Sequence, residues 1–118
     1  MEVVRKFRPR GVKSLLDLLC LSALSEREMT VYEVMALIYK KFGVLLSPGT
    51  IYPRIAYLEK SGLILTVGLG RKKTYTLTDK GKDALQSWLK ELDEMLFDLR
   101  SFLRVFTKKE LSTNLVEA

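Results

Sequence analysis

The chain has 118 residues and a formal net charge of +6, from twenty Lys and Arg against fourteen Asp and Glu, with no histidine. This length suffices for one modest domain with an appendage and is short for a two-lobed enzyme. Without histidine, and with its single cysteine in an apolar run, the chain cannot assemble a His/Cys metal site or a Ser/His or Cys/His nucleophile, so we expect no enzyme, metal or cofactor.

The charge is unevenly distributed. Residues 1–82 carry fifteen Lys and Arg against seven Asp and Glu, and residues 83–118 carry five against seven, so the two parts are +8 and −2. A basic body with a slightly acidic tail indicates a polyanionic partner for the body and a separate role for the tail. On charge alone, a basic protein without such a partner has similar weight.

The single cysteine, Cys20, excludes an internal disulfide and fits a reducing compartment. Basic residues precede the apolar run 15–24, as in a signal peptide, but Asp17 interrupts the run and its leucines fit a helix stripe. No segment reaches the length of a membrane span. We therefore expect a cytoplasmic protein.

The first ten residues hold four basic side chains and are interpreted as an N-terminal arm, either an ordered turn or a loose segment along phosphate backbone. Gly11 to Leu24 should form the first helix, with Leu15, Leu18, Leu19 and Cys20 directed inward.

A second helix is predicted from Thr30, where Thr30 and Glu33 have the spacing of a capping box. It should end at about Phe42, before Gly43, and its buried side chains should be Val34, Met35, Leu37 and Ile38. A short turn then leads to a third helix, so residues 30–61 have the pattern of a helix-turn-helix.

The third helix should begin with Ser47 as N-cap and Pro48 in the first turn, and end at Ser61-Gly62. Its inward face is Ile51, Ile55 and Leu58. Pro53 removes the amide that would bond to the carbonyl of Gly49, so a kink or tight first turn is expected.

The opposite face of this helix is predicted to present donors, aromatic rings and one guanidinium, which suit contact with nucleic acid. These residues are Thr50, Tyr52, Arg54 and Tyr57. We expect Arg54 to reach a guanine edge or a phosphate, against the alternative of a solvated helix charge. The tyrosines have the alternative of half-buried packing with a wet hydroxyl.

Two β-prone runs, residues 63–67 and 74–78, enclose a glycine-containing basic tip and predict a hairpin. Three cations at the tip, Arg71, Lys72 and Lys73, fit phosphate or minor-groove contact better than a plain solvated turn. The tip's two glycines lack the third glycine and the following helix of a nucleotide-binding loop.

Helix, hairpin and basic tip in this order predict a winged helix-turn-helix domain over residues 11–78, in a mostly helical α+β chain. The stretch SPGTIYPRIAYLEKSGLI, followed by a basic hairpin and YTLTDKGKDAL, resembles the PadR-like transcriptional regulators over roughly residues 12–90. The resemblance implies a DNA-binding regulator and adds Ser47, Gly49 and Pro53 of the motif to the DNA-binding residues. Tyr32 resembles a tyrosine common near the start of the family's second helix.

A long last helix, capped by Thr78, is predicted over residues 79–107, which leaves 108–118 as a tail and a candidate for disorder. Apolar residues recur along it at steps of three and four, as a heptad seam does. They are Leu85, Trp88, Leu92, Met95, Leu99, Phe102 and Phe106. Such a seam extends further than a small body can cover, so we expect a second copy of the chain as its partner, against the alternative of packing within one chain.

The resemblance also implies a small-molecule effector near the dimer interface, where Trp88 and Phe102 would line the gap, although such aromatic stripes more often serve packing. We conclude that the sequence describes a homodimeric, sequence-specific double-stranded DNA-binding regulator, most simply a repressor. The alternatives are an architectural DNA-coating protein with little sequence specificity and a module that recruits a different protein through the seam.

Overall fold

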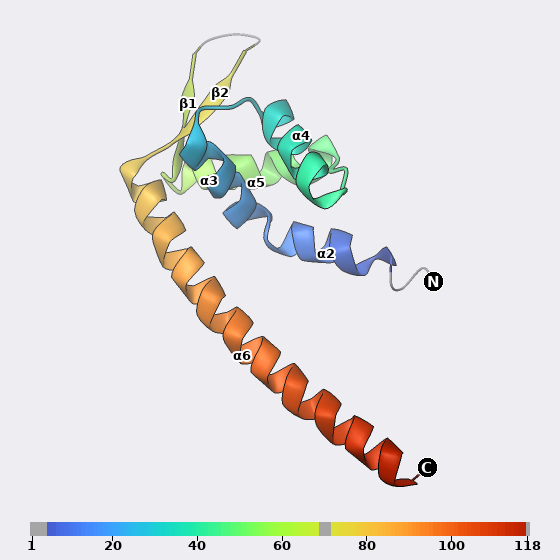
Figure 1. Cartoon of the computed structure of the whole chain (residues 1–118). Coiled ribbons are helices and arrows are strands. Elements are labelled where there is room, and N and C mark those ends of the chain that lie inside the picture. The colour runs from blue at the N-terminus through green and yellow to red at the C-terminus, as the bar shows by residue number, and fades with distance from the viewer. Residues whose placement is uncertain (1–4, 69–71, 118) are drawn as a thin grey trace. The chain divides into compact units, whose positions relative to one another are not determined.

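The computed structural model describes the backbone of residues 5–68 and 72–117 and the side chains as far as Arg104, apart from the same gap. The elements, in chain order, are α2 (Phe7–Ser14), α3 (Leu16–Glu26), α4 (Val31–Phe42), α5 (Pro48–Lys60), β1 (Ile64–Val67), β2 (Thr74–Leu77) and α6 (Asp79–Glu117) (Figure 1). The chain divides into two compact units, residues 1–85 and 86–118, which are described separately.

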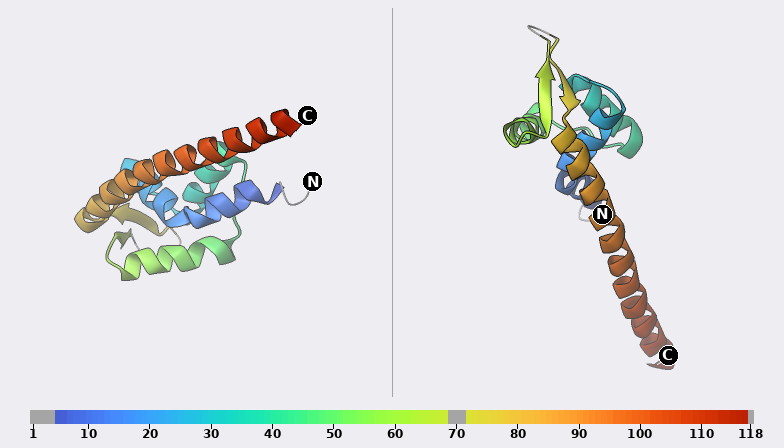
Figure 2. Two further views of the ribbon diagram at one scale, coloured as in Figure 1. Left: turned by 90° about the horizontal axis from the view of Figure 1, so that it is seen from below. Right: turned by 90° about the vertical axis from the view of Figure 1, so that its left-hand side faces the viewer.

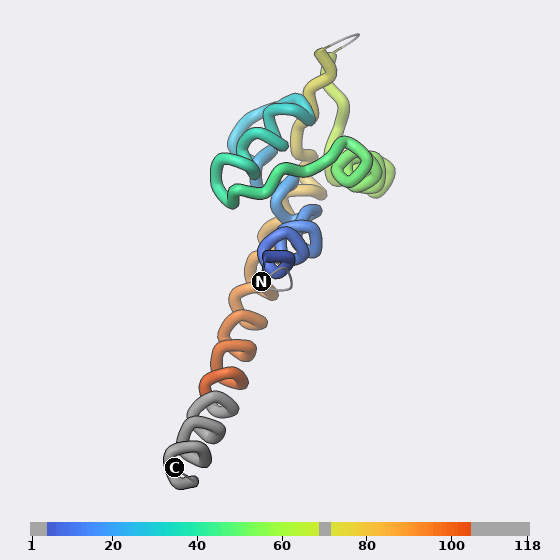
Figure 3. The backbone as a smooth tube through the Cα atoms, turned by 90° about the vertical axis from the view of Figure 1, so that its right-hand side faces the viewer, coloured from blue at the N-terminus to red at the C-terminus, as the bar shows by residue number. Residues whose placement is uncertain are grey.

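The first unit has one apolar core, to which α2 to α5, both strands and the start of α6 contribute (Figure 2). Its most completely buried side chains are Leu16, Cys20, Leu21, Val34, Leu46, Ile51, Leu58 and Ile64. Burial of each large aliphatic side chain is worth about 1.5–3 kcal/mol, so these residues supply the main stabilisation of the unit. The hairpin and α2 lie at opposite ends of the unit (Figure 3).

The first predicted helix is divided in two. Helix α2 begins at Phe7, inside the segment interpreted as an arm, and the break falls at Leu15, which is 42% exposed. The inward stripe of α3 is Leu16, Cys20 and Leu24, so the expected burial of Leu15 is wrong and that of Cys20 is confirmed. In the leucine-rich run 15–21 several registers bury apolar side chains equally well, and periodicity does not choose between them.

Helix α4 has the predicted boundaries. The Glu33 amide donates to Thr30 Oγ1 at 3.1 Å and the Thr30 amide donates to Glu33 Oε1 at 3.3 Å, which confirms the capping box. Arg27 binds the same carboxylate at 2.7 Å, and this hydrogen bond lowers the pKa of Glu33. Gly43 ends the helix at φ +69°. Val34 is buried as expected.

Two further expectations for α4 have opposite outcomes. Ile38 is buried, as the helical pattern predicts, whereas Leu37 is 41% exposed, and its expected burial is wrong. An exposed leucine costs a helix little, so the pattern alone over-counts the core.

Helix α5 runs through Pro53 without interruption to Lys60. Its apolar stripe of Ile51, Ile55 and Leu58 is buried, as predicted. The helix ends in a Schellman motif, since the Leu63 amide donates to the Leu58 carbonyl and Gly62 has φ +78°.

The hairpin pairs β1 with β2 in antiparallel register, from Ile64 opposite Leu77 to Val67 opposite Thr74. Each strand is one residue shorter than predicted. A third short segment joins the sheet at Met29, which exchanges two backbone hydrogen bonds with Tyr75 at 2.8 and 3.2 Å. The hairpin is thereby attached to the loop before α4.

Helix α6 begins where predicted, because Thr78 Oγ1 accepts a hydrogen bond from the Gly81 amide at 3.0 Å. The same hydroxyl donates to the Gly62 carbonyl at 2.7 Å, and Lys80 Nζ donates to the Ser61 carbonyl at 2.9 Å. The helical backbone continues to Glu117, beyond the expected end at residue 107. After Gly81 the chain has no glycine or proline to stop it.

Gly81 is buried, and a Cβ atom there would overlap the carbonyl oxygen of Leu63. We therefore predict that Gly81→Ala lowers the free energy of unfolding by about 3 kcal/mol, the upper part of the usual range for overpacking. Gly11→Ala is the matched control, because no atom lies within 4 Å of a Cβ at that helical position and alanine favours helix. Urea unfolding should show a lower midpoint for Gly81→Ala only; equal midpoints would contradict the close approach.

Candidate nucleic-acid interface

The outward side of α5 follows from its buried stripe. With about 100° between successive residues, the positions opposite Ile51 and Ile55 are Pro53, Ala56, Tyr57 and Lys60, and all four are exposed. Sequence reasoning missed Ala56 and Lys60, although the same helical arithmetic places them there.

Of the four residues predicted for the outward face, Tyr57 lies on its α3 side and the other three lie on the flanks. Thr50 and Arg54 lie on the flank that faces α3, while Tyr52 shares the other flank with Glu59. Tyr52 and Tyr57 are exposed, and Thr50 and Arg54 are half-buried. The structure therefore divides the predicted set between two edges of the helix.

Arg54 forms a bidentate salt bridge with Asp17 of α3, called the Arg54–Asp17 fork from here on. Its Nε donates to Asp17 Oδ1 at 2.7 Å and its Nη2 to Asp17 Oδ2 at 2.6 Å. The guanidinium also lies over the Tyr57 ring, with Cζ 4.6 Å from the ring centroid. The Asp17 hydrogen bonds raise the pKa of Arg54, so its positive charge is permanent.

Cys20 is completely buried between α3 and α5. Burial and, to a smaller extent, the nearby Asp17 raise the pKa of the Cys20 thiol to about 12, and Arg54 opposes the shift. Cys20 is therefore a neutral thiol at ordinary pH and acts as a small apolar side chain. Its predicted core position is confirmed.

The N-terminal end of α5 is open to a ligand. Ser47, Pro48 and Gly49 are exposed, and Ser47 Oγ lies 2.9 Å from Thr50 Oγ1, so the two hydroxyls form a pair at the first turn. A helix N-terminus carries partial positive charge and suits a phosphate.

The hairpin adds positive charge beside α5. Lys72 and Lys73 are exposed, whereas Arg71 lies outside the described residues. Thr66 of β1 donates a hydrogen bond to the Glu59 carboxylate of α5, which connects the hairpin to the helix. Hairpin and helix are thus held together on one side of the first unit.

Two exposed side chains of the first unit were not among the residues predicted to contact DNA, although Tyr32 had been singled out by the family resemblance. Leu45 is exposed in the turn before α5, and Tyr32 is exposed at the first turn of α4. A leucine at a turn has no place in either helix stripe, and that misfit is the only sequence signal for it.

The second unit presents a broad apolar stripe on α6. Of the predicted seam, Trp88, Met95, Leu99 and Phe102 are exposed and Leu92 is half-buried, whereas Leu85 is buried in the core of the first unit. The side chain of Phe106 lies outside the described ones.

Sequence reasoning missed part of this stripe. Leu89, Leu96 and Leu103 are also exposed, each one place after a seam residue. Their spacing of seven residues is a clear signal, which widens the seam from two heptad positions to three.

Comparison with known proteins decides the family. The model of the transcriptional regulator PadR-like family matches residues 20–87, which is more than half of the chain. The chain belongs to the PadR-like family. No individual curated protein matches it.

Solved structures agree with the PadR-like assignment. A PadR family transcription regulator from Clostridium difficile R20291 is 26% identical, with TM-score 0.68 over 75% of this chain and 98% of that chain. A transcriptional regulator from Clostridium thermocellum is 25% identical, with TM-score 0.71 over 79% and 94%. Bacillus subtilis PadR in complex with operator DNA is 32% identical, with TM-score 0.56 over 64% of this chain and 45% of that chain.

The structure explains two motifs that carried the PadR-like resemblance. In the first, Ser47 and Thr50 pair their hydroxyls at the start of α5. In the second, Thr78 caps α6 and Gly81 allows the close approach to Leu63. Both motifs stand at helix starts, but only Thr78 caps its helix with a side chain, because the Ser47 side chain bonds to no backbone amide of α5.

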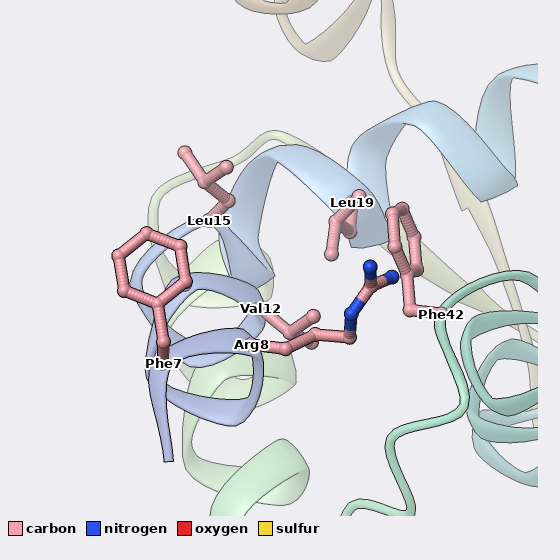
Figure 4. A pocket seen from close by; sticks show the side chains of 7 residues that line it. Phe7, Arg8, Val12, Leu15, Leu19 and Phe42 are labelled. Atoms are coloured by element: carbon pink, nitrogen blue, oxygen red, sulfur yellow. The ribbon is translucent and has the colours of Figure 1, made fainter. Parts of the chain in front are cut away.

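The PadR-like chain also has an open apolar hollow in its first unit, where α2, α3 and α4 meet (Figure 4). It has a volume of about 240 Å³ and is lined by Phe7, Arg8, Gly11, Val12, Leu15, Leu19 and Phe42. Figure 4 shows the Arg8 side chain extending toward Phe42. Ligand pockets usually exceed about 300 Å³, and the expected effector residues, Trp88 and Phe102, do not line this hollow.

Among the described side chains, those of residues 5–68 and 72–104, no group of His, Cys, Asp or Glu is arranged to hold a metal ion. Over the same residues no helix is both long enough and apolar enough to cross a membrane.

Proposed function

We propose that the chain binds double-stranded DNA sequence-specifically, as a homodimeric transcriptional regulator and most simply as a repressor. The observation that carries this proposal is the exposed side of α5, next to a hairpin that bears lysines, on a unit whose core holds both in place. The complex of Bacillus subtilis PadR with operator DNA supports it, since that protein is 32% identical over the matched region.

In this proposal α5 enters the major groove. Tyr52 and Tyr57 flank the exposed face and Thr50 lies at its N-terminal end, where side chains reach base edges. Ser47, Gly49 and Pro53 bring the positive end of the helix close to the backbone. Small residues on this side permit close approach of the helix to DNA.

The hairpin tip contacts the flanking phosphates. Lys72, Lys73 and Arg71 are the residues proposed for this contact, which positions the protein without reading sequence. The excess of +8 over residues 1–82 supplies the long-range attraction.

Helix α6 is proposed as the dimer interface. The seam from Trp88 through Leu92 and Met95 to Leu99, widened by Leu89, exposes more apolar surface than an isolated helix in water would keep. Pairing with α6 of a second copy covers it symmetrically.

Two finer assignments complete the proposal. A small-molecule effector would bind near this interface, at Trp88 and Phe102, where aromatic rings offer apolar area. The unpaired, buried thiol of Cys20 suits the reducing cytoplasm, where a DNA-binding regulator meets its operator.

Selection of bound fragments from random DNA tests the proposed function. We expect enrichment of an inverted repeat, with affinity for the selected site at least ~10³-fold above that for scrambled DNA. Binding without enrichment would instead indicate an architectural protein, and no binding would exclude DNA as the partner.

Replacement of Lys72 and Lys73 by alanine should weaken binding to selected and scrambled duplexes by a similar factor. A dimer that covers about seven phosphates has a slope of log K against log salt near −6, and loss of two cations per protomer makes it shallower by about four. Lys40→Ala/Lys41→Ala is the matched control, at the last turn of α4. Titrations at several salt concentrations measure the slopes, and an unchanged slope for the Lys72/Lys73 variant would remove the hairpin from the interface.

Leu99→Glu should split the dimer. The substitution places two carboxylates in a symmetric interface, and loss of each buried leucine costs about 1.5–3 kcal/mol before the charge is counted. Phe97→Glu is the control, because Phe97 lies off the seam and is 71% exposed. Sedimentation at micromolar concentration should give a monomer for Leu99→Glu and a dimer for Phe97→Glu; a dimeric Leu99→Glu variant would reject the interface.

A further inference from the structure

The fork between Arg54 and Asp17 occupies the one cation in the middle of α5. Its Nε and one Nη2 hydrogen are directed at the two carboxylate oxygens, at 2.7 and 2.6 Å, across 37 residues of sequence. Paired donors of this kind match a carboxylate in both distance and plane. They match a guanine edge or a phosphate equally well, so Asp17 and DNA compete for the edge formed by Nε and Nη2, which holds two of the five N–H donors of the guanidinium.

Two features of the free protein favour Asp17 over DNA as the partner of this edge of Arg54. It lies in the first turn of α3, where the helix dipole favours a carboxylate, and its side chain is 25% exposed. The Tyr57 ring holds the guanidinium from a further side. Arg54 is thereby fixed by two neighbours in the absence of any DNA.

The pair also changes what DNA meets on this flank. The ion pair formed by the guanidinium and the carboxylate has no net charge, and its carboxylate repels a phosphate that approaches it. The half-buried pair joins α3 to α5, so it fixes the helix about its own axis while contributing little attraction to phosphate.

We infer that Asp17 is a positioning residue that withholds from DNA the Nε–Nη2 edge and the net charge of Arg54, and that the pair orients α5 on α3. The inference rests on the proposed DNA binding. It assigns Arg54 to the orientation of the reading helix, in place of the base contact that the sequence alone suggests. Asp17 thus favours specific over non-specific binding without touching DNA.

The test compares Asp17→Asn with Asp17→Asn/Arg54→Gln, in the full chain, on scrambled duplex over a series of salt concentrations. Asp17→Asn releases one cation per protomer, so its slope of log K against log salt should steepen by about two for the dimer. Over a fourfold change in salt this amounts to about a tenfold larger loss of affinity. In the double variant the slope should return to that of the wild type.

Glu26→Gln is the matched control. It removes one carboxylate from the same helix, and α3 ends at this residue. Its slope should equal that of the wild type, because it releases no arginine. An Asp17→Asn slope equal to that of the wild type would overturn the inference, and so would a double variant as steep as Asp17→Asn.

A measurement on the wild type needs no variant to fold. The Nε–H proton of Arg54 should exchange slowly with water in the free protein. Its NMR chemical shift should stay unchanged when the selected DNA site is added. A resonance that moves on binding would show that Arg54 leaves Asp17 for DNA, and would reject the inference. Wild-type protein that binds no DNA at all would reject the proposed function instead, so the two failures are distinguishable.

Discussion

Burial of one stripe on a thirteen-residue helix controls the first unit. Ile51, Ile55 and Leu58 are almost completely inaccessible, and their packing fixes which side of α5 remains outside. A single helix of this length is marginal in water, so tertiary packing must hold it. The packing of this stripe therefore determines which side of α5 is exposed, and the fold does not depend on the polar residues of that exposed side.

Around this stripe the polar contacts serve orientation more than stability. The Arg54–Asp17 fork is half-exposed, and pairs of that kind contribute modestly to folding. The Glu59–Thr66 bond connects helix and hairpin in the same way. Both contacts lie at flanks of α5, so they resist rotation of the helix, which the apolar stripe alone resists less well.

Local rules predicted most of this fold. The Thr30–Glu33 capping box, the helix ends at Gly43 and Gly62 and the existence of the hairpin follow from chemistry within a few residues, and the structure contains them. The motif that begins at Ser47 resembled the PadR-like regulators, and the family model that matches the chain is the same family. The prediction of the buried stripe of α5 was correct because all the large aliphatic residues of that helix fall on one face.

The failures have a common physical origin in partners distant in sequence. The break at Leu15 and the exposure of Leu37 depend on how α2 to α4 pack, and many leucines satisfy the same periodicity. Asp17 was interpreted only as an interruption of an apolar run, and Arg54 as a groove contact, because no local pattern joins residues 37 positions apart. The second row of the α6 stripe, Leu89, Leu96 and Leu103, could in contrast have been predicted, because these leucines recur every seven residues in the sequence.

The hydroxyl of Thr78 has a consequence for the geometry of the first unit. It bonds at once to the carbonyl of Gly62, where α5 has just ended, and to the amide of Gly81, where α6 has just begun. Gly81 lets the start of α6 lie directly against the backbone of Leu63, because glycine has no side chain to separate the two. Within the first unit, the end of α5 and the start of α6 are therefore held against each other through one hydroxyl and one glycine, and any side chain added at position 81 would have to push these two helix ends apart.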